Sequence, residues 1–249
     1  MSSLSWDELS IIAAALAAGG LVKGVTGVGL PLVAVPILAG FLGVERAVLI
    51  LVIPAVVLNA YQVLRHLAES AAMPEWPRMI GAGVPGAAVG AGVLHAASDR
   101  MLATALAIWI LAYLVFRLLH PSFALSLRMR LRWSPVVGAA AGALQAATGI
   151  SAPVVAAYAD ALGLRPSAYV FAVCAPFGAF AAAHLAVVSL SGIYTAELFT
   201  QSLFAVLPAI AAIPLGARLR VHISRAVFDG TIRVTLLLMA ARLLYTSWF

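Results

Sequence analysis

Two short stretches of the chain combine the residue types that bind small anions. Residues 23–31 read KGVTGVGLP and residues 145–153 read QAATGISAP, so threonine, glycine and proline recur at the same spacing. Glycine interrupts a helix and proline suits the first turn of the next one. Each stretch therefore predicts a break between two helices. The first turn after a break has unpaired amide N–H groups and the positive end of the helix dipole, which together favour an anion.

Side chains beside both breaks add further hydrogen-bond donors. The predicted substrate-binding residues are Lys23, Thr26, Gly27, Gly29, Gln145, Thr148, Gly149 and Ser151. A lysine inside a membrane is costly and marks a function, although the same side chain can also extend to the membrane surface. For the two Thr-Gly pairs, the alternative is that small residues let helices pack closely.

His184 is the candidate for carrying a coupling proton, because it lies in an apolar segment and an unperturbed histidine has a pKa of about 6.5. The alternative is a histidine that only packs between helices. The single cysteine, Cys174, and the lack of a Cys/His cluster predict no metal site and no cofactor. The one enzyme-like reading is an intramembrane serine hydrolase that pairs Ser151 with His184. We otherwise expect the chain not to be an enzyme.

The composition identifies the elements that must hold these residues. Of the 249 residues, 64% are hydrophobic and 10% are charged, whereas about a quarter are charged in soluble domains. A soluble enzyme, a nucleic-acid binder and a disordered chain are thereby excluded. The sequence predicts an all-α polytopic membrane protein, since about 20 apolar residues make one spanning helix. Its apolar segments are 9–25, 28–43, 47–66, 77–97, 100–119, 135–149, 151–163, 167–190, 198–218 and 226–247.

The order of these segments repeats, which predicts a duplicated unit of the kind seen in transporters. In each half the first two segments are short and separated by the glycine-rich break, and three longer segments follow. Pro54 in the first half matches Pro176 in the second. The predicted organisation is an N-terminal membrane repeat over 1–120, a basic cytoplasmic loop over 121–134, and a C-terminal membrane repeat over 135–249.

The arginines predict how the repeats are oriented. If each half crosses the membrane an odd number of times, the repeats have inverted topology and both termini lie outside. Arg46 and Arg100 are then external, and the arginines in cytoplasmic segments are Arg65, Arg78, Arg117, Arg128, Arg130, Arg132, Arg165, Arg218, Arg220 and Arg225. This division follows the positive-inside rule. It holds whether the short segments span the membrane or are re-entrant.

At the glycine-rich breaks the sequence resembles the TauE/SafE sulfite exporter family, also called the toluene sulfonate uptake permease family. The resemblance lies in Gly24, Gly27, Gly29 and Pro31 of the first half. The second half has a degenerate copy in Thr148, Gly149 and Pro153, where Ala146, Ser151 and Ala152 replace expected glycines. It implies transport of sulfite, another sulfur oxyanion or an organosulfur anion across the bacterial inner membrane.

From the residues and the resemblance together, we expect a secondary transporter that exports a small sulfur oxyanion, foremost sulfite, by alternating access. The alternative within transport is the import or export of organic sulfonates or other small anions. The expected partners are the anion, membrane lipid and a coupling proton, without nucleic acid. The sequence is also compatible with a homo-oligomer.

Overall fold

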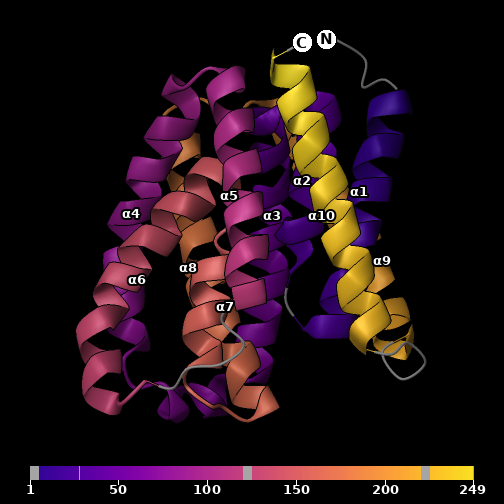
Figure 1. Ribbon diagram of the computed structural model, residues 1–249. Coiled ribbons are helices and arrows are strands. Elements are labelled where there is room, and N and C mark those ends of the chain that lie inside the picture. Colours follow the sequence, from indigo (N-terminus) through magenta and orange to yellow (C-terminus); the bar gives the residue numbers. More distant parts are fainter. Residues whose placement is uncertain (1–5, 28, 120–124, 220–224, 249) are drawn as a thin grey trace. The chain divides into compact units, whose positions relative to one another are not determined.

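The structure, a computed structural model, describes residues 6–27, 29–119, 125–219 and 225–248, and these residues form helices and short connections without a strand (Figure 1). The helices are α1 (Trp6–Thr26), α2 (Leu30–Leu42), α3 (Val44–Arg65), the 3-10 helix η1 (Leu67–Ala72), α4 (Trp76–Ala96), α5 (Asp99–Leu119), α6 (Leu127–Thr148), α7 (Ala152–Asp160), α8 (Pro166–Leu190), α9 (Ala196–Leu219) and α10 (Arg225–Trp248). Six helices of the described residues, α1, α3, α4, α5, α8 and α9, are long and apolar enough to cross a membrane. The predicted all-α polytopic membrane protein is confirmed.

The first helix of each predicted short pair is longer than expected. α1 has 21 residues and α6 has 22, so only α2 and α7, with 13 and 9, are short. Counting apolar residues missed the polar first turns. Asp7 and Glu8 begin α1, where the helix dipole favours carboxylates. Ser126 caps α6 by accepting a hydrogen bond from the Met129 amide at 3.4 Å.

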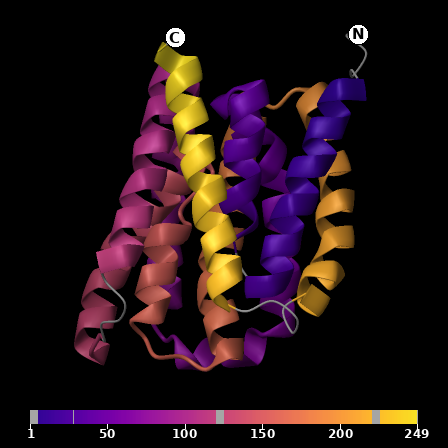
Figure 2. The same ribbon diagram turned by 45° about the vertical axis from the view of Figure 1, so that its right-hand side comes forward.

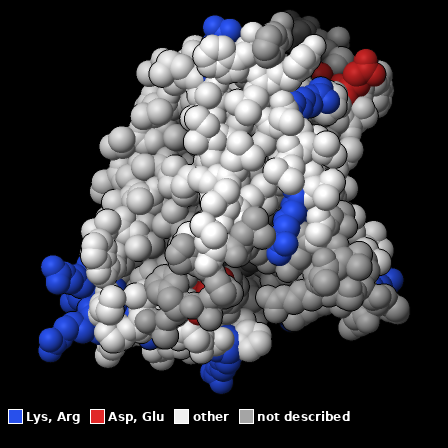
Figure 3. Space-filling model, in the orientation of Figure 1, with Lys and Arg blue, Asp and Glu red and all other residues white. Residues whose placement is uncertain are grey.

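The predicted basic loop over 121–134 is therefore wrong as a loop from residue 127 onward, because those residues form the first turns of α6. Residues 121–124 lie outside the described residues. In Figure 3, a group of Lys and Arg residues lies at the lower left, over the beginning of α6, whereas uncharged residues cover most of the face shown. Arg128 and Arg132 are among the exposed residues at this helix end.

The chain forms two compact units, and each draws on both predicted repeats. The first unit contains residues 1–54, 97–114 and 194–249, and the second contains 55–96 and 115–193. The two compact units thus divide the chain differently from the two predicted repeats. The repeat boundaries at 120 and 135 stay a prediction. α3 passes from the first unit into the second between Pro54 and Ala55.

In the first unit, α1 packs against α9 through glycines. A Cβ atom on Gly20 would collide with the carbonyl oxygen of Ala209, and one on Gly24 would collide with that of Ile213. Small residues permit such backbone contact between membrane helices, where dispersion rather than the hydrophobic effect drives packing. α1 begins and α10 ends at the same end of this unit (Figures 1 and 2).

In the second unit, α4 and α6 also pack closely through glycines. A Cβ atom on Gly142 would collide with the carbonyl oxygen of Gly83, and one on Gly138 with that of Met79. The predicted repeats match α1 with α6 and α4 with α9. In both units, therefore, the first helix of one repeat packs against the fourth helix of the other.

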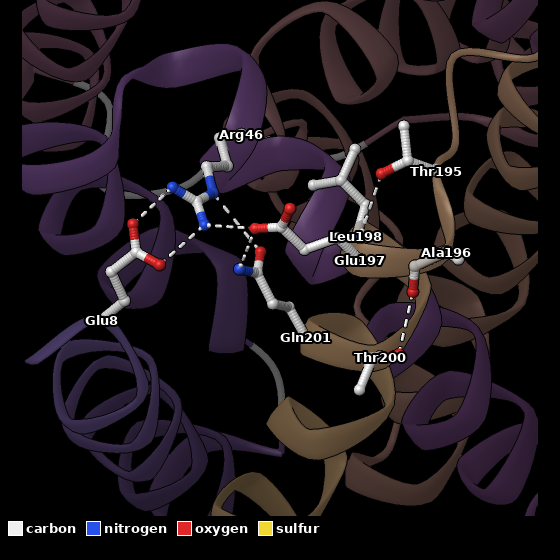
Figure 4. Close-up of polar contacts among 8 residues, drawn as sticks. All are labelled: Glu8, Arg46, Thr195, Ala196, Glu197, Leu198, Thr200 and Gln201. Atoms are coloured by element: carbon white, nitrogen blue, oxygen red, sulfur yellow. Dashed lines mark hydrogen bonds and ion pairs between the residues drawn. The ribbon is translucent and has the colours of Figure 1, made fainter. Parts of the chain in front are cut away.

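A charged cluster joins the beginnings of three helices in the first unit (Figure 4). Arg46, in α3, forms two hydrogen bonds with the Glu8 carboxylate of α1, at 2.7 and 3.0 Å. Its guanidinium also donates to Glu197 of α9 at 3.2 Å and to the Gln201 side-chain oxygen at 3.4 Å. These contacts show that α1, α3 and α9 begin at one end of this unit.

Candidate anion-binding site

The first predicted break is present between α1 and α2, in the first unit. Gly27 and Gly29 have φ angles of 81° and 96°, a left-handed conformation that glycine adopts at little cost. The Gly27 amide donates to the Lys23 carbonyl at 2.7 Å and ends α1, and the Leu32 amide donates to the Gly29 carbonyl at 3.1 Å as α2 begins. Pro31 lies in the first turn of α2, as predicted.

The second predicted break is present between α6 and α7, in the second unit. Gly149 has a φ angle of 73°, and its amide donates to the Gln145 carbonyl at 2.8 Å. α7 begins after Ser151, whose carbonyl accepts from the Val154 and Val155 amides at 3.0 and 3.2 Å. Ser151 has a φ angle of −110° where the matched Gly29 has a positive one. This difference explains why the second copy accepts a residue other than glycine there.

The side chains of the first break include a buried cation. Lys23 lies in the last turn of α1 and is only 4% exposed. A cation is favoured there by the negative end of the helix dipole, and its burial argues against an extension to the membrane surface. Thr26 is exposed, and its hydroxyl donates to the Val22 carbonyl at 2.8 Å.

The side chains of the second break bond to each other and to a third helix. The Ser151 hydroxyl donates to the Gln145 side-chain oxygen at 2.8 Å, and the Gln145 amide nitrogen donates to the Phe177 carbonyl of α8 at 2.9 Å. The Thr148 hydroxyl donates to the Leu144 carbonyl at 2.7 Å. Since these hydroxyl protons are used within the protein, an anion here would meet mainly backbone N–H groups.

His184 lies in α8, in the same unit as the second break. Its side chain is 2% exposed, and its Nε2 atom has no hydrogen-bond partner among the described residues. The Ser151 hydroxyl bonds to Gln145 instead, so Ser151 and His184 do not form the hydrogen-bonded pair that a serine hydrolase requires. Among the described residues, no cluster of three or more His, Cys, Asp or Glu side chains is placed to hold a metal ion.

Each break thus brings its own predicted residues together: Lys23, Thr26, Gly27 and Gly29 in the first unit, and Gln145, Thr148, Gly149 and Ser151 in the second. Their binding of an anion stays a prediction.

Sequence reasoning missed a buried ion pair in the second unit. Glu75, just before α4, is fully buried and pairs with Arg130 of α6, with N–O distances of 2.8 and 3.1 Å. Arg130 also donates to the Ala72 carbonyl at 3.0 Å, and the Tyr158 hydroxyl of α7 donates to Glu75 at 3.0 Å. α7 is therefore hydrogen-bonded at both ends, through Ser151 and Tyr158. The only sequence signal was a lone carboxylate preceding an apolar segment.

A comparison with protein-family models decides the family. The model described as "Sulfite exporter TauE/SafE" matches residues 11–243, nearly the whole chain. The chain belongs to this family. It is thus a multi-pass membrane protein of a transporter family that exports sulfite and related sulfur anions. No curated protein and no solved structure matches the chain significantly.

Proposed function

We propose that this TauE/SafE family member exports sulfite from the cell by alternating access, with the helix breaks as its substrate site. The observation that carries the proposal is the presence of two matched, glycine-kinked breaks within a chain of a sulfite exporter family. Non-helical backbone at membrane depth is tolerated where it is buried in protein or lines a polar cavity. In transporters such breaks present helix N-termini to anionic groups of the substrate.

The proposed donors are the amides nearest each break. The next amides along, of Leu32, Val154 and Val155, already donate to backbone carbonyls, and the Ile150 amide donates to the Thr148 hydroxyl oxygen. We therefore assign the anion to the N–H groups of Gly29 and Leu30 at the first break and of Ser151 and Ala152 at the second. Lys23 supplies the formal positive charge. Gln145 contributes through its side-chain amide and through the position in which it holds Ser151.

The hydroxyls of Thr26 and Thr148 have a supporting role in this proposal. Each donates to the carbonyl four residues earlier in its own helix, at 2.8 and 2.7 Å. Such a bond from a threonine hydroxyl to the carbonyl four residues earlier fixes the side chain against its own helix. The two threonine side chains are therefore held in a defined position next to Gly27 and Gly149.

The membrane potential favours the proposed direction. In a cell with a negative interior, the export of each negative charge is favoured by about 2.3 kcal/mol per 100 mV of membrane potential.

We propose His184 as the residue that binds a coupling proton, because its buried Nε2 atom is free to accept one. The matched packing of α1 on α9 and of α6 on α4 supports two inverted repeats as the moving framework.

Flux measurements in proteoliposomes test the proposal. We expect the wild-type protein to transport sulfite faster than sulfate or methanesulfonate. Lys23→Gln, which copies the matched Gln145, should lower sulfite flux about tenfold, since a hydrogen bond to a charged group contributes about 1.5–3 kcal/mol. The charge-matched control is Arg65→Gln, because Arg65 stacks on Tyr61 at the exposed end of α3.

Equal flux in Lys23→Gln and wild type, with equal amounts of folded protein, would refute the assigned site. Absence of sulfite flux in the wild type would refute the proposed function itself. Faster transport of methanesulfonate than of sulfite would favour a sulfonate transporter.

A further inference from the structure

α3 contains a backbone group that its own helix does not satisfy. Pro54 lies within α3 and has no amide hydrogen, so it cannot donate to the carbonyl of Ile50 four residues earlier. Ile50 is fully buried. In the hydrocarbon region an unsatisfied carbonyl costs several kcal/mol, so a partner from another element is needed.

Ser202 of α9 is that partner. Its hydroxyl donates to the Ile50 carbonyl at 2.7 Å and accepts a hydrogen bond from the Ile53 amide at 3.2 Å. Ser202 is fully buried. The Ser202 hydroxyl thus supplies the donor that Ile50 lacks and also contacts the Ile53 amide, on the N-terminal side of the proline. Gln201, next to Ser202 in α9, accepts a hydrogen bond from Arg46 at the beginning of α3.

The contact between Ser202 and α3 lies next to the boundary between the two compact units. The first compact unit ends at Pro54 and the second begins at Ala55. The N-terminal half of α3 is anchored to α9 by Arg46 and by Ser202. The C-terminal half lies against α8, since a Cβ atom on Gly178 would lie 3.3 Å from the Cβ atom of Asn59. Each half of α3 is therefore held within its own unit.

We propose that Ser202 is a positioning residue that replaces the backbone donor missing at Pro54. We propose further that α3 bends at this point during transport. The proposal rests on the alternating-access function proposed above. Hinges are a few positions that absorb changes in backbone angles. α3 is one helix from Val44 to Arg65, and Pro54 removes one of the backbone hydrogen bonds that couple its two halves. A side-chain hydroxyl can satisfy Ile50 in more than one backbone geometry.

The main test restores the missing donor. Pro54→Ala gives residue 54 an amide that can bond to Ile50 and close the helix. We expect the maximum rate of sulfite flux to fall about fivefold, the effect of one net hydrogen bond, with an unchanged KM. The matched control is Pro85→Ala, because Pro85 lies inside α4 and within one unit. Its flux should stay within about twofold of wild type.

A second measurement isolates Ser202. Ser202→Ala should lower the thermal stability of the wild type, because the buried Ile50 carbonyl loses its donor. It should lower that of Pro54→Ala less, because the new amide then satisfies Ile50. Equal losses of stability in both backgrounds would overturn the positioning role, and this readout does not require sulfite transport.

Spin labels report the bending directly. In a Cys174→Ala background, labels at the exposed positions 64 and 203 should give a distance distribution that changes with sulfite in the wild type and stays fixed in Pro54→Ala. The proposed bending at Pro54 would be refuted by an unchanged maximum rate of sulfite flux in Pro54→Ala. It would also be refuted if Pro85→Ala lowered that rate equally. If the wild type transports no sulfite, the proposed function fails, whereas the stability comparison still decides the role of Ser202.

Discussion

Removing one partner of the ion pair between Glu75 and Arg130 should strongly destabilise the second unit. Glu75 is fully buried and the Arg130 side chain is 14% exposed. Glu75→Gln keeps the shape and the acceptor for Tyr158 but leaves the Arg130 charge without its counter-charge. Removing one partner of a buried pair costs about 3–5 kcal/mol. The retained hydrogen bonds place the expected loss near the lower limit, about 3 kcal/mol.

The assay is thermal unfolding in lipid nanodiscs. For a chain of this size, about 3 kcal/mol corresponds to a decrease in Tm of about 6–12 °C. Arg130→Met should cause a similar loss, because it leaves the Glu75 charge unpaired. The double variant Glu75→Leu with Arg130→Met should lie within about 1 kcal/mol of wild type, since an apolar pair of similar size often replaces a buried ion pair without loss.

Tyr158→Phe is the matched control. It removes one hydrogen bond to Glu75 while leaving the ion pair, so we expect a loss of about 1 kcal/mol. A Tm decrease below about 2 °C in Glu75→Gln would refute the assignment of a buried, stabilising pair. So would a double variant whose loss equals the sum of the single losses, because the two charges would then act independently.

Three further outcomes follow from the same reasoning. Gly142→Leu should prevent the close packing of α6 on α4, because its Cβ atom alone would overlap the Gly83 carbonyl; loss of folded protein on size exclusion checks this. The Ser167 hydroxyl holds the pKa of Glu69 below its ordinary value of 4.5, so the contact between η1 and α8 should persist above that value and weaken as the pH falls through the lowered pKa. Hydrogen exchange of η1 would show this transition, and Ser167→Ala should move it upward toward 4.5. His184→Gln should abolish the response of flux to a pH gradient and leave the response to membrane potential; an unchanged pH response would exclude His184 as the proton carrier.

Much of the local structure could be predicted because it depends on residue types that act over a few positions. Gly27 and Gly149 take left-handed backbone angles at matched places, and helices resume at Leu30 and Ala152. The helix beginnings were predicted less well. α6 extends back to Leu127 because Ser126 caps it, and an arginine-rich sequence does not reveal its helical state through hydropathy.

The side-chain chemistry of the candidate site was predicted only as a set of residues. Their donors and acceptors depend on neighbours that the motif does not contain. The sequence suggested Ser151 as a donor toward the substrate or as a nucleophile, whereas its hydroxyl bonds to Gln145, which in turn reaches Phe177 in another helix. Periodicity cannot show such a bond, because it records which face of a helix is polar but not what that face meets.

By itself, the sequence determined that this protein lies in a membrane, that two helices break at glycine, and that it belongs to a family of anion exporters. Hydrophobic run length and backbone sterics are local properties, and they act in the same way wherever the segment is placed. Only the tertiary structure decided that Ser202 satisfies α3 across 152 positions and that Arg130 pairs with Glu75 across 55. Those contacts arise because a low-dielectric interior compels each buried polar group to find a partner, and which partner lies within reach depends on how the helices pack.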